Sequence, residues 1–385
     1  MGTHPSNPSK DISTGLSLLD MVSSNQSLLS PAVAARYNSA LPFLFKILSI
    51  RKALSIQAHP DKKLAERLRE QDPKNYPDDN HKPEMTIAVT AFDGFCGFRP
   101  LAEIKSFLSH IPTFRQLVGE ETAAEFEEAV KEPTSEESKT VEANKAALKK
   151  LFSALMHAEQ TAIESAAKDL IAAATDSPGS FGGSEHGGEQ LAKLIQRLNS
   201  QFPNDIGLFC TFLLNYITLQ PGEAIFLQAN DPHAYLSGDI IECMAASDNV
   251  VRAGFTPKFK DVKNLTEMLT YSYAPIEAQK MKPVAYSKGS NSKADKPTSL
   301  LYDPPIDEFA VVRTGLGEGQ KETFEGVQGP SIVIFTEGGG KITVGPKTLE
   351  AREGLVFFVG ATAEVVIEAA EKGTVAFRAF CEIEE

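Results

Sequence analysis

The period of the hydrophobic positions changes along the chain and divides it into four zones. In residues 1–97 short apolar runs alternate with turns, whereas in residues 98–204 apolar side chains recur every three or four positions. The second spacing is that of one face of an amphipathic helix. In residues 205–275 and 276–385 the period is two, in short runs separated by Gly and Pro, which is typical of β-strands and turns.

The helical zone carries the strongest amphipathic pattern. Apolar residues from Leu148 to Met156 fall at i, i+3, i+4, i+7 and i+8, and those from Ile163 to Ile171 repeat the spacing, so we expect one long helix. A Gly-rich loop follows Asp176, and another helix is expected to begin near Leu191. The sequence therefore predicts a mainly β protein, built as a sandwich or barrel, with an inserted helical domain.

Length and composition allow a large core. The chain has 385 residues, of which 42% are hydrophobic and 23 are Phe, and this excludes a disordered or small disulfide-stapled protein. At the usual domain size, roughly two to four domains are expected. The net charge of −13 argues against a nucleic-acid or membrane partner. A small anionic substrate is compatible with it, because a basic pocket can form locally on an acidic protein.

The cysteines and the start of the chain bear on location. The four Cys residues lie far apart and form no C-x-x-C pair, which indicates a reducing compartment and no structural disulfide. The first residues are polar and lack the apolar core of a signal peptide. The longest apolar stretch, 207–219, is too short to cross a bilayer. We therefore expect a cytoplasmic protein.

Three segments place polar side chains where a metal site can form. The expected strands 54–59 and 80–89 each present polar residues on one face, because residues two apart point the same way. The third segment, 229–235, is a turn that leads into a strand and carries the last histidine of the chain. The candidate ligands are Gln57, His59, Glu84 and His233. Two nitrogen and two oxygen donors with room for water suit catalytic Zn²⁺, with Mn²⁺, Co²⁺ or Fe²⁺ as alternatives. Ordinary half-buried polar strand residues are the simpler interpretation.

Three longer motifs resemble a known enzyme family. They are LPFLFKILSIRKALSIQAHPDK at 41–62, NHKPEM at 80–85, and the block that begins LQPGEAIFLQANDPHAY and spans 219–262. All three are similar to type I phosphomannose isomerase, the mannose-6-phosphate isomerase family, and the resemblance extends over essentially the whole chain.

The resemblance implies a fold of cupin-type jelly rolls. Residues 1–97 and 205–275 correspond to the catalytic cupin, 98–204 to the helical insertion domain, and 276–385 to a metal-free, cupin-like C-terminal β-domain. In the family, a segment with a Y-x-W-G motif and an E-L-W sequence precedes the M-G-T-H-P motif with which this chain starts. We therefore expect an N-terminally truncated, fungal-like member whose catalytic jelly roll lacks its first strands. The absence of Trp agrees with this.

The resemblance also implies roles for the site residues. It places Zn²⁺, one per chain, on the four candidate ligands, and it makes Arg252 a catalytic residue. The remaining residues of the family's substrate cleft correspond to Lys46, Ser55, Lys82, Glu242 and Lys258.

The implied activity interconverts mannose 6-phosphate and fructose 6-phosphate through a cis-enediol and supplies GDP-mannose synthesis and protein glycosylation. It requires a base, stabilisation of an oxyanion and a grip on the phosphate. Lys82 and Glu242 are both candidates for proton transfer; alternatively, Lys82 pairs with a carboxylate and Glu242 orients a histidine ligand. Arg252 can stabilise charge on the reacting oxygens or hold the phosphate. The candidate phosphate or hydroxyl contacts are Lys46, Ser55 and Lys258.

Two other classes of function are considered. A cupin Fe²⁺ oxygenase would use two His and one carboxylate, and oxygen consumption would distinguish it from an isomerase. An inactive, truncated sugar-phosphate-binding protein would bind its ligand without turnover. His81 has the wrong strand parity to join Glu84, so we expect it to be structural. A small-molecule sugar phosphate as the partner and a monomeric state follow from the resemblance.

Overall fold

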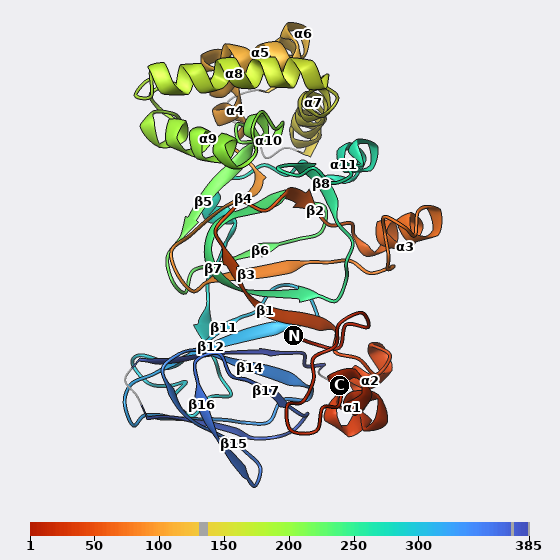
Figure 1. The fold of residues 1–385 in the computed structure, drawn as a ribbon, viewed down its shortest axis with the longest axis vertical. Helices are drawn as coiled ribbons and strands as arrows, with labels where there is room; N and C mark the ends of the chain where they lie inside the picture. Colours follow the sequence, from red (N-terminus) through yellow and green to blue (C-terminus); the bar gives the residue numbers. More distant parts are fainter. Residues whose placement is uncertain (131–137, 371–372, 384–385) are drawn as a thin grey trace.

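The computed structural model of the chain describes residues 1–130, 138–370 and 373–383. Figure 1 shows three tiers along the longest axis: a helical domain, a central β-domain and a C-terminal β-domain. The expected mainly β architecture with a helical insertion is confirmed. All four cysteines are buried and none forms a disulfide, as expected. No helix within these ranges has the length and apolar character needed to cross a membrane.

The central β-domain is built on a nine-stranded sheet in the described chain. Its strands are β1 (Phe43–Ile50), β2 (Ile56–Ala58), β3 (Glu84–Ala88), β4 (Phe92–Phe98), β5 (Leu214–Leu219), β6 (Ala224–Leu227), β7 (His233–Ala245), β8 (Val251–Gly254) and β9 (Lys280–Met281). The strands come from both sides of the helical insertion, so the sheet forms only when distant parts of the chain pair.

β7 is the centre of this sheet because it pairs with four other strands. Its first half pairs with β2 and β4, and its second half pairs with β1 and β3. Between Tyr235 and Ser237 the register against β4 slips by one residue, which marks a β-bulge. Gly238 follows with a φ of +110°, and a Cβ there would lie 2.6 Å from the carbonyl oxygen of Ala91, so this bend requires glycine. β7 therefore contributes to both halves of the sheet.

The helical domain lies above the edge of the sheet formed by β5 and β4 (Figure 1). Its helices are α4 (Leu101–His110), α5 (Pro112–Val118), α6 (Glu120–Ala129), α7 (Ser138–Met156), α8 (Gln160–Asp176), α9 (Glu189–Gln201) and α10 (Gly207–Cys210). Helix α9 confirms the helix expected near Leu191.

The single long helix expected over 148–171 is wrong, because the chain forms two helices, α7 and α8, with a break at residues 157–159. At the break, the Nδ1 atom of His157 hydrogen-bonds the carbonyl oxygen of Ser153 at 2.8 Å. The apolar phase survives the break because Met156 and Ile163 are seven residues apart, about two helical turns. Periodicity alone therefore does not reveal where the first helix ends.

The C-terminal β-domain is a sandwich of two sheets. The six-stranded sheet consists of β10 (Val284–Ala285), β11 (Ser299–Tyr302), β12 (Ala310–Leu316), β14 (Ser331–Glu337), β17 (Val356–Val359) and β19 (Thr374–Phe380). The four-stranded sheet consists of β13 (Lys321–Phe324), β15 (Gly339–Val344), β16 (Lys347–Arg352) and β18 (Val365–Ala369). An apolar core that includes Val312, Phe335 and Ile367 fills the space between the sheets.

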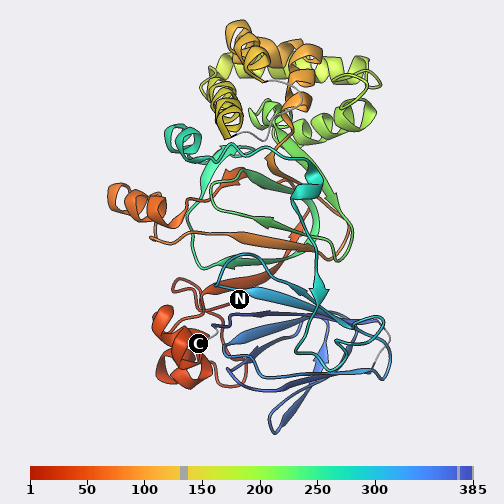
Figure 2. The same cartoon turned by 180° about the vertical axis from the view of Figure 1, so that it is seen from behind.

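The two β-domains share a core and are not separated by a linker. Phe43 and Ile241 of the central sheet belong to the same buried cluster as Val311, Ile332 and Phe377 of the six-stranded sheet. Seen from behind in Figure 2, the C-terminal strands lie directly below the central ones. This contact fixes the orientation of the central sheet from below.

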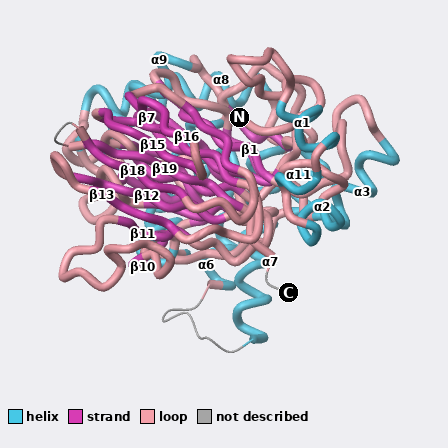
Figure 3. Tube along the Cα trace, turned by 90° about the horizontal axis from the view of Figure 1, so that it is seen from below, coloured by secondary structure: helices cyan, strands magenta, loops and turns pink. Residues whose placement is uncertain are grey.

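The remaining helices gather on one flank of the molecule, as Figures 1 and 3 agree. They are α1 (Leu18–Ser24), α2 (Pro31–Arg36), α3 (Lys62–Gln71) and α11 (Val262–Met268), with short 3₁₀ turns at Gln26–Leu28 and Ile276–Ala278. Helix α3 begins just after His59, where Asp61 caps it by accepting a hydrogen bond from the Leu64 N–H at 2.9 Å. The cap fixes the path of the chain as it leaves β2.

Candidate metal centre and active site

Three buried side chains converge inside the central β-domain. His59 follows β2, Glu84 is the first residue of β3, and His233 is the first residue of β7. Their potential ligand atoms all lie within 4.8 Å of one another. The Nε2 atoms of His59 and His233 are each 3.3 Å from a different oxygen of the Glu84 carboxylate. The structure therefore brings three of the four predicted metal ligands to one point.

The Nδ1 atoms of both histidines face backbone carbonyls. Nδ1 of His59 lies 2.6 Å from the carbonyl oxygen of Asn249, and Nδ1 of His233 lies 3.3 Å from that of Asp231. A proton on Nδ1 leaves the lone pair on Nε2 free. Burial lowers the pKa of His59 to about 4, which favours the neutral ring. Both rings are thus arranged to offer Nε2 as a ligand.

The two Nε2 atoms are buried and have no hydrogen-bond partner among the described residues, because their contacts with Glu84 lack hydrogen-bond geometry. An unpaired buried nitrogen is costly, so two that face one carboxylate need an explanation. Two imidazole nitrogens and a carboxylate oxygen are ligands that Zn²⁺ prefers. The residues present therefore fit a divalent metal ion.

Gln57 lies beside this cluster through the strand register. On β2 it pairs with His233 of β7 and with Arg252 of β8, so three candidate residues share one level of the sheet. Directly opposed residues have Cβ atoms roughly 4.5–5.5 Å apart. The side-chain oxygen of Gln57 accepts a hydrogen bond from the Ser55 hydroxyl at 3.3 Å. This places two more of the predicted site residues, Gln57 and Ser55, next to the cluster.

Glu84 is held by neighbours on two sides. The Tyr235 hydroxyl donates to its Oε2 at 3.2 Å and accepts a hydrogen bond from the Thr86 hydroxyl at 2.8 Å. Lys82 Nζ lies 3.3 Å from Oε1. Burial alone would raise the pKa of Glu84, but its contacts with His59, Lys82 and His233 hold it well below its usual value. The carboxylate is therefore ionised and fixed in direction.

Glu242 and Lys46 form a second charged pair in the same interior. They are opposed across β1 and β7, and Lys46 Nζ lies 2.8 Å from Glu242 Oε2. Glu242 is 3% exposed, and it also lies opposite Thr86 of β3. Burial, together with the charge of Glu84, raises the pKa of Glu242 against the opposing effect of Lys46. This pair is on the second half of β7, whereas Gln57 pairs with His233 at the start of that strand.

Arg252 is half-buried, and no ion pair to it forms within the described residues. Burial lowers the pKa of its guanidinium. Lys258 lies in the exposed loop after β8, where its backbone N–H bonds the Thr256 hydroxyl, and the described structure does not bring it into contact with the other candidates. Arg252 thus offers an uncommitted cation beside Gln57, whereas Lys258 lies apart.

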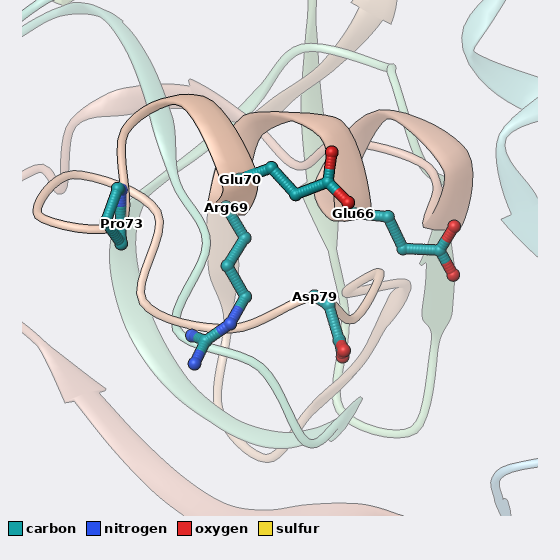
Figure 4. Close-up of a pocket in the computed structure, with 5 residues that line it drawn as sticks. All are labelled: Glu66, Arg69, Glu70, Pro73 and Asp79. Carbon is teal, nitrogen blue, oxygen red and sulfur yellow. The ribbon is translucent and has the colours of Figure 1, made fainter.

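A surface hollow of about 310 Å³ lies elsewhere, against α3. It is lined by Glu66, Arg69, Glu70, Pro73 and Asp79. Figure 4 shows Arg69 and Glu70 projecting from the helix and Asp79 facing them from the following loop. Three carboxylates against one guanidinium disfavour a sugar phosphate. The hollow contains none of the predicted site residues.

Sequence reasoning missed two contributors. Tyr235 shares a strand face with His233, and this two-residue spacing was the available signal for it. The carbonyl of Asn249 that orients His59 is a backbone group, so no residue type in the sequence indicates it. His81, expected to be structural, binds Glu308 of the loop before β12, with its Nε2 2.6 Å from the carboxylate.

Three family models match the chain. Phosphomannose isomerase type I, catalytic domain, matches residues 1–101. The helical insertion domain of phosphomannose isomerase type I matches residues 117–214, and the C-terminal model of the same family matches residues 299–347.

Curated relatives match over the full chain. Mannose-6-phosphate isomerase from Aspergillus fumigatus is 58% identical, over 100% of this chain and 87% of the relative. The enzyme of that name from Saccharomyces cerevisiae is 52% identical, over 99% of this chain and 88% of the relative. A solved zinc-bound mannose 6-phosphate isomerase is 29% identical, with a TM-score of 0.80, over 100% of this chain and 90% of that one. The fold is therefore of the cupin type found in these structures.

Proposed function

Because the chain belongs to the type I phosphomannose isomerase family, we propose that it interconverts mannose 6-phosphate and fructose 6-phosphate. It is an aldose–ketose isomerase, and the reaction moves a proton between C1 and C2 through a cis-enediol. The observation that carries the proposal is the pair of unpaired, buried Nε2 atoms of His59 and His233 facing Glu84. Arg252, for which the described residues provide no ion-pair partner, is on β8. Gln57 of β2 lies between it and His233 of β7.

The proposed cofactor is Zn²⁺, one per chain, on His59, Glu84 and His233 with Gln57 as the fourth ligand. The two imidazole Nε2 atoms and the ionised carboxylate supply the donor types that this ion takes. When bound, the ion supplies Lewis-acid stabilisation of negative charge on the sugar oxygens. The zinc-bound relative supports this choice of metal.

Arg252 is proposed to bind the oxygens on which negative charge develops, because its guanidinium is half-buried and free for a bidentate contact. Ser55 is proposed to contact a sugar hydroxyl, since among the described residues its hydroxyl bonds only the neighbouring Gln57. Lys46 and Lys258 are proposed phosphate contacts. A contact from Lys258 requires its exposed loop to approach the substrate.

Proton transfer is proposed to involve Lys82 and Glu242. Each is paired with an opposite charge in the interior, Lys82 with Glu84 and Glu242 with Lys46. Such pairing holds a proton-carrying group in place next to the substrate. Exchange of the substrate C2 proton with solvent distinguishes their roles. We compare K82M with E242Q. The variant that still binds substrate but no longer exchanges the C2 proton identifies the base.

The activity is tested by coupling fructose 6-phosphate formation from mannose 6-phosphate to a dye-linked readout. We expect turnover that a chelator abolishes and Zn²⁺ restores, with no oxygen consumed. Activity that is indifferent to chelation contradicts the metal assignment. Binding of substrate without turnover supports the inactive-form alternative, and oxygen uptake supports the oxygenase. The isomerase relatives favour neither alternative.

The wider setting is also proposed. The product mannose 6-phosphate would feed GDP-mannose synthesis, and the buried thiols and absence of disulfides support a cytoplasmic location. Residues 1–97 and 205–275 carry the catalytic site, while 98–204 and 276–385 support it. A monomer with no nucleic-acid or membrane partner is consistent with the charge of −13. Light scattering after gel filtration tests the monomer.

A further inference from the structure

An arginine lies inside the C-terminal β-domain, far in the chain from the proposed active site. Arg378 is in the middle of β19, opposite Val312 of β12 and Val333 of β14 (β19 is labelled in Figure 3). It is 3% exposed. Ala376 and Phe380, two residues to either side on the same face of β19, belong to the apolar core between the two sheets. The Arg378 side chain therefore projects into that core.

The guanidinium is only partly satisfied there. Its Nε donates to the Ser331 hydroxyl at 3.0 Å, but Nη1 and Nη2 are buried and have no hydrogen-bond partner within the described residues. The hydroxyl of Tyr286 is also buried and has no hydrogen-bond partner among the described residues. Both groups lie against Phe324: the Arg378 guanidinium carbon is 5.9 Å from its ring centre, and the Tyr286 ring is 6.0 Å away. Three hydrogen-bond donors thus share one region of an apolar core.

Within the part of the chain that the structure describes, no acceptor is bonded to these donors. Glu382, whose charge acts on Arg378, is bonded to Lys288 Nζ at 2.6 and 2.7 Å and to the Gln328 N–H at 2.7 Å. A guanidinium keeps its proton under ordinary conditions, and burial raises the pKa of Tyr286 to about 12, so all three groups remain donors. A buried guanidinium with no hydrogen-bonded counter-charge is costly. A negatively charged acceptor would remove that cost.

We propose that the core of the C-terminal β-domain binds a small monovalent anion of chloride size between the Arg378 guanidinium and the Tyr286 hydroxyl. The small size follows from the surroundings. The neighbours Val312, Phe324 and Phe380 are apolar and could not satisfy the additional hydroxyls of a sugar phosphate. The site is independent of the proposed metal centre, and its occupant stabilises the domain that supports the central sheet from below.

The first test is thermal unfolding of the full chain in chloride, formate or gluconate at constant ionic strength. A ligand of the folded state raises the unfolding temperature by mass action, so we expect a chloride-specific rise of about 2 °C or more. The rise should disappear in R378M and decrease in Y286F. R352M is the matched control, because Arg352 is an exposed arginine of the same domain, and its response should equal that of the wild type. A formate response larger than the chloride response overturns the halide assignment.

The second test is the structure of the wild-type protein crystallised in bromide. We expect an anomalous peak in hydrogen-bond contact with both Nη atoms and the Tyr286 hydroxyl. A water only at that place, or a guanidinium turned onto Glu382, overturns the proposal. If R378M does not fold, Y286F and the bromide peak decide the question. A peak combined with an equal chloride response in wild type and Y286F indicates an adventitious ion only and also overturns it.

Discussion

Replacing Tyr235 with Phe tests whether the residues around Glu84 set the affinity for the metal. The substitution removes the hydroxyl that donates to Glu84 Oε2 and that accepts a hydrogen bond from Thr86. A hydrogen bond to a charged group contributes roughly 1.5–3 kcal/mol. Loss of such a supporting contact typically weakens metal binding roughly 10- to 100-fold. We expect Y235F to lose zinc affinity in this range.

The assay is competition with a chromophoric chelator, followed by isomerase activity as a function of free Zn²⁺. Because Tyr235 acts through Glu84, kcat/KM at saturating zinc should stay within a few-fold of the wild type. A zinc affinity unchanged within error would refute the reasoning. A low kcat/KM at saturating zinc would instead indicate that Tyr235 touches the substrate.

Two further variants separate orientation of Glu84 from general destabilisation. Y235F leaves the buried Thr86 hydroxyl without its acceptor, at a cost of about 1–3 kcal/mol in unfolding free energy. The double variant T86V/Y235F removes both polar groups, so it should recover stability but not zinc affinity. Y216F is the matched control, because the Tyr216 hydroxyl also donates to a carboxylate, that of Asp93, at 2.8 Å. Its zinc affinity should equal that of the wild type.

Three other predictions concern single residues. R252K should lower kcat/KM by roughly 10- to 100-fold with zinc affinity unchanged, because a lysine cannot make the bidentate contact; equal loss of zinc binding would contradict the assigned role. E322Q should be less stable than the wild type near neutral pH, as measured by urea unfolding. Burial tends to raise the pKa of Glu322, but hydrogen bonds from Thr298, Asn291 and Ser290 lower it overall. The ionised Glu322 therefore stabilises the folded protein fully above the unfolded-state pKa of about 4.3, and this stabilisation is lost as the pH falls through the lowered pKa. The stability difference between E322Q and the wild type should therefore shrink in acid, and a difference that is constant with pH would be inconsistent with this. H81F should reduce stability and disturb the segment that carries Lys82, because it breaks the contact with Glu308 of the C-terminal β-domain; unchanged unfolding and unchanged kcat would show that the contact is dispensable.

The sequence alone predicted the polar strand faces but not the contacts between strands. Strand parity put Gln57 and His59 on one face, and the structure places Gln57 opposite His233 and His59 against Glu84. Parity does not determine which residues of other strands lie opposite them. The level shared by Gln57, His233 and Arg252 depends on how β2 pairs with β7 and β8, and these strands are far apart in the sequence. Here the family resemblance supplied what the pattern did not.

β7 shows most clearly why a strict alternation of side chains is not sufficient. His233 and Tyr235 are odd-numbered and Glu242 is even-numbered, so uninterrupted pairing would put Glu242 on the opposite face. The bulge between Tyr235 and Ser237 inserts one residue and reverses the alternation. Tyr235 and Ile240 consequently belong to the same buried cluster, and Glu242 faces the interior with Lys46. One irregular residue pair in β7 therefore allows a single strand to carry a metal ligand, the tyrosine that orients Glu84 and a candidate proton-transfer group toward the same interior.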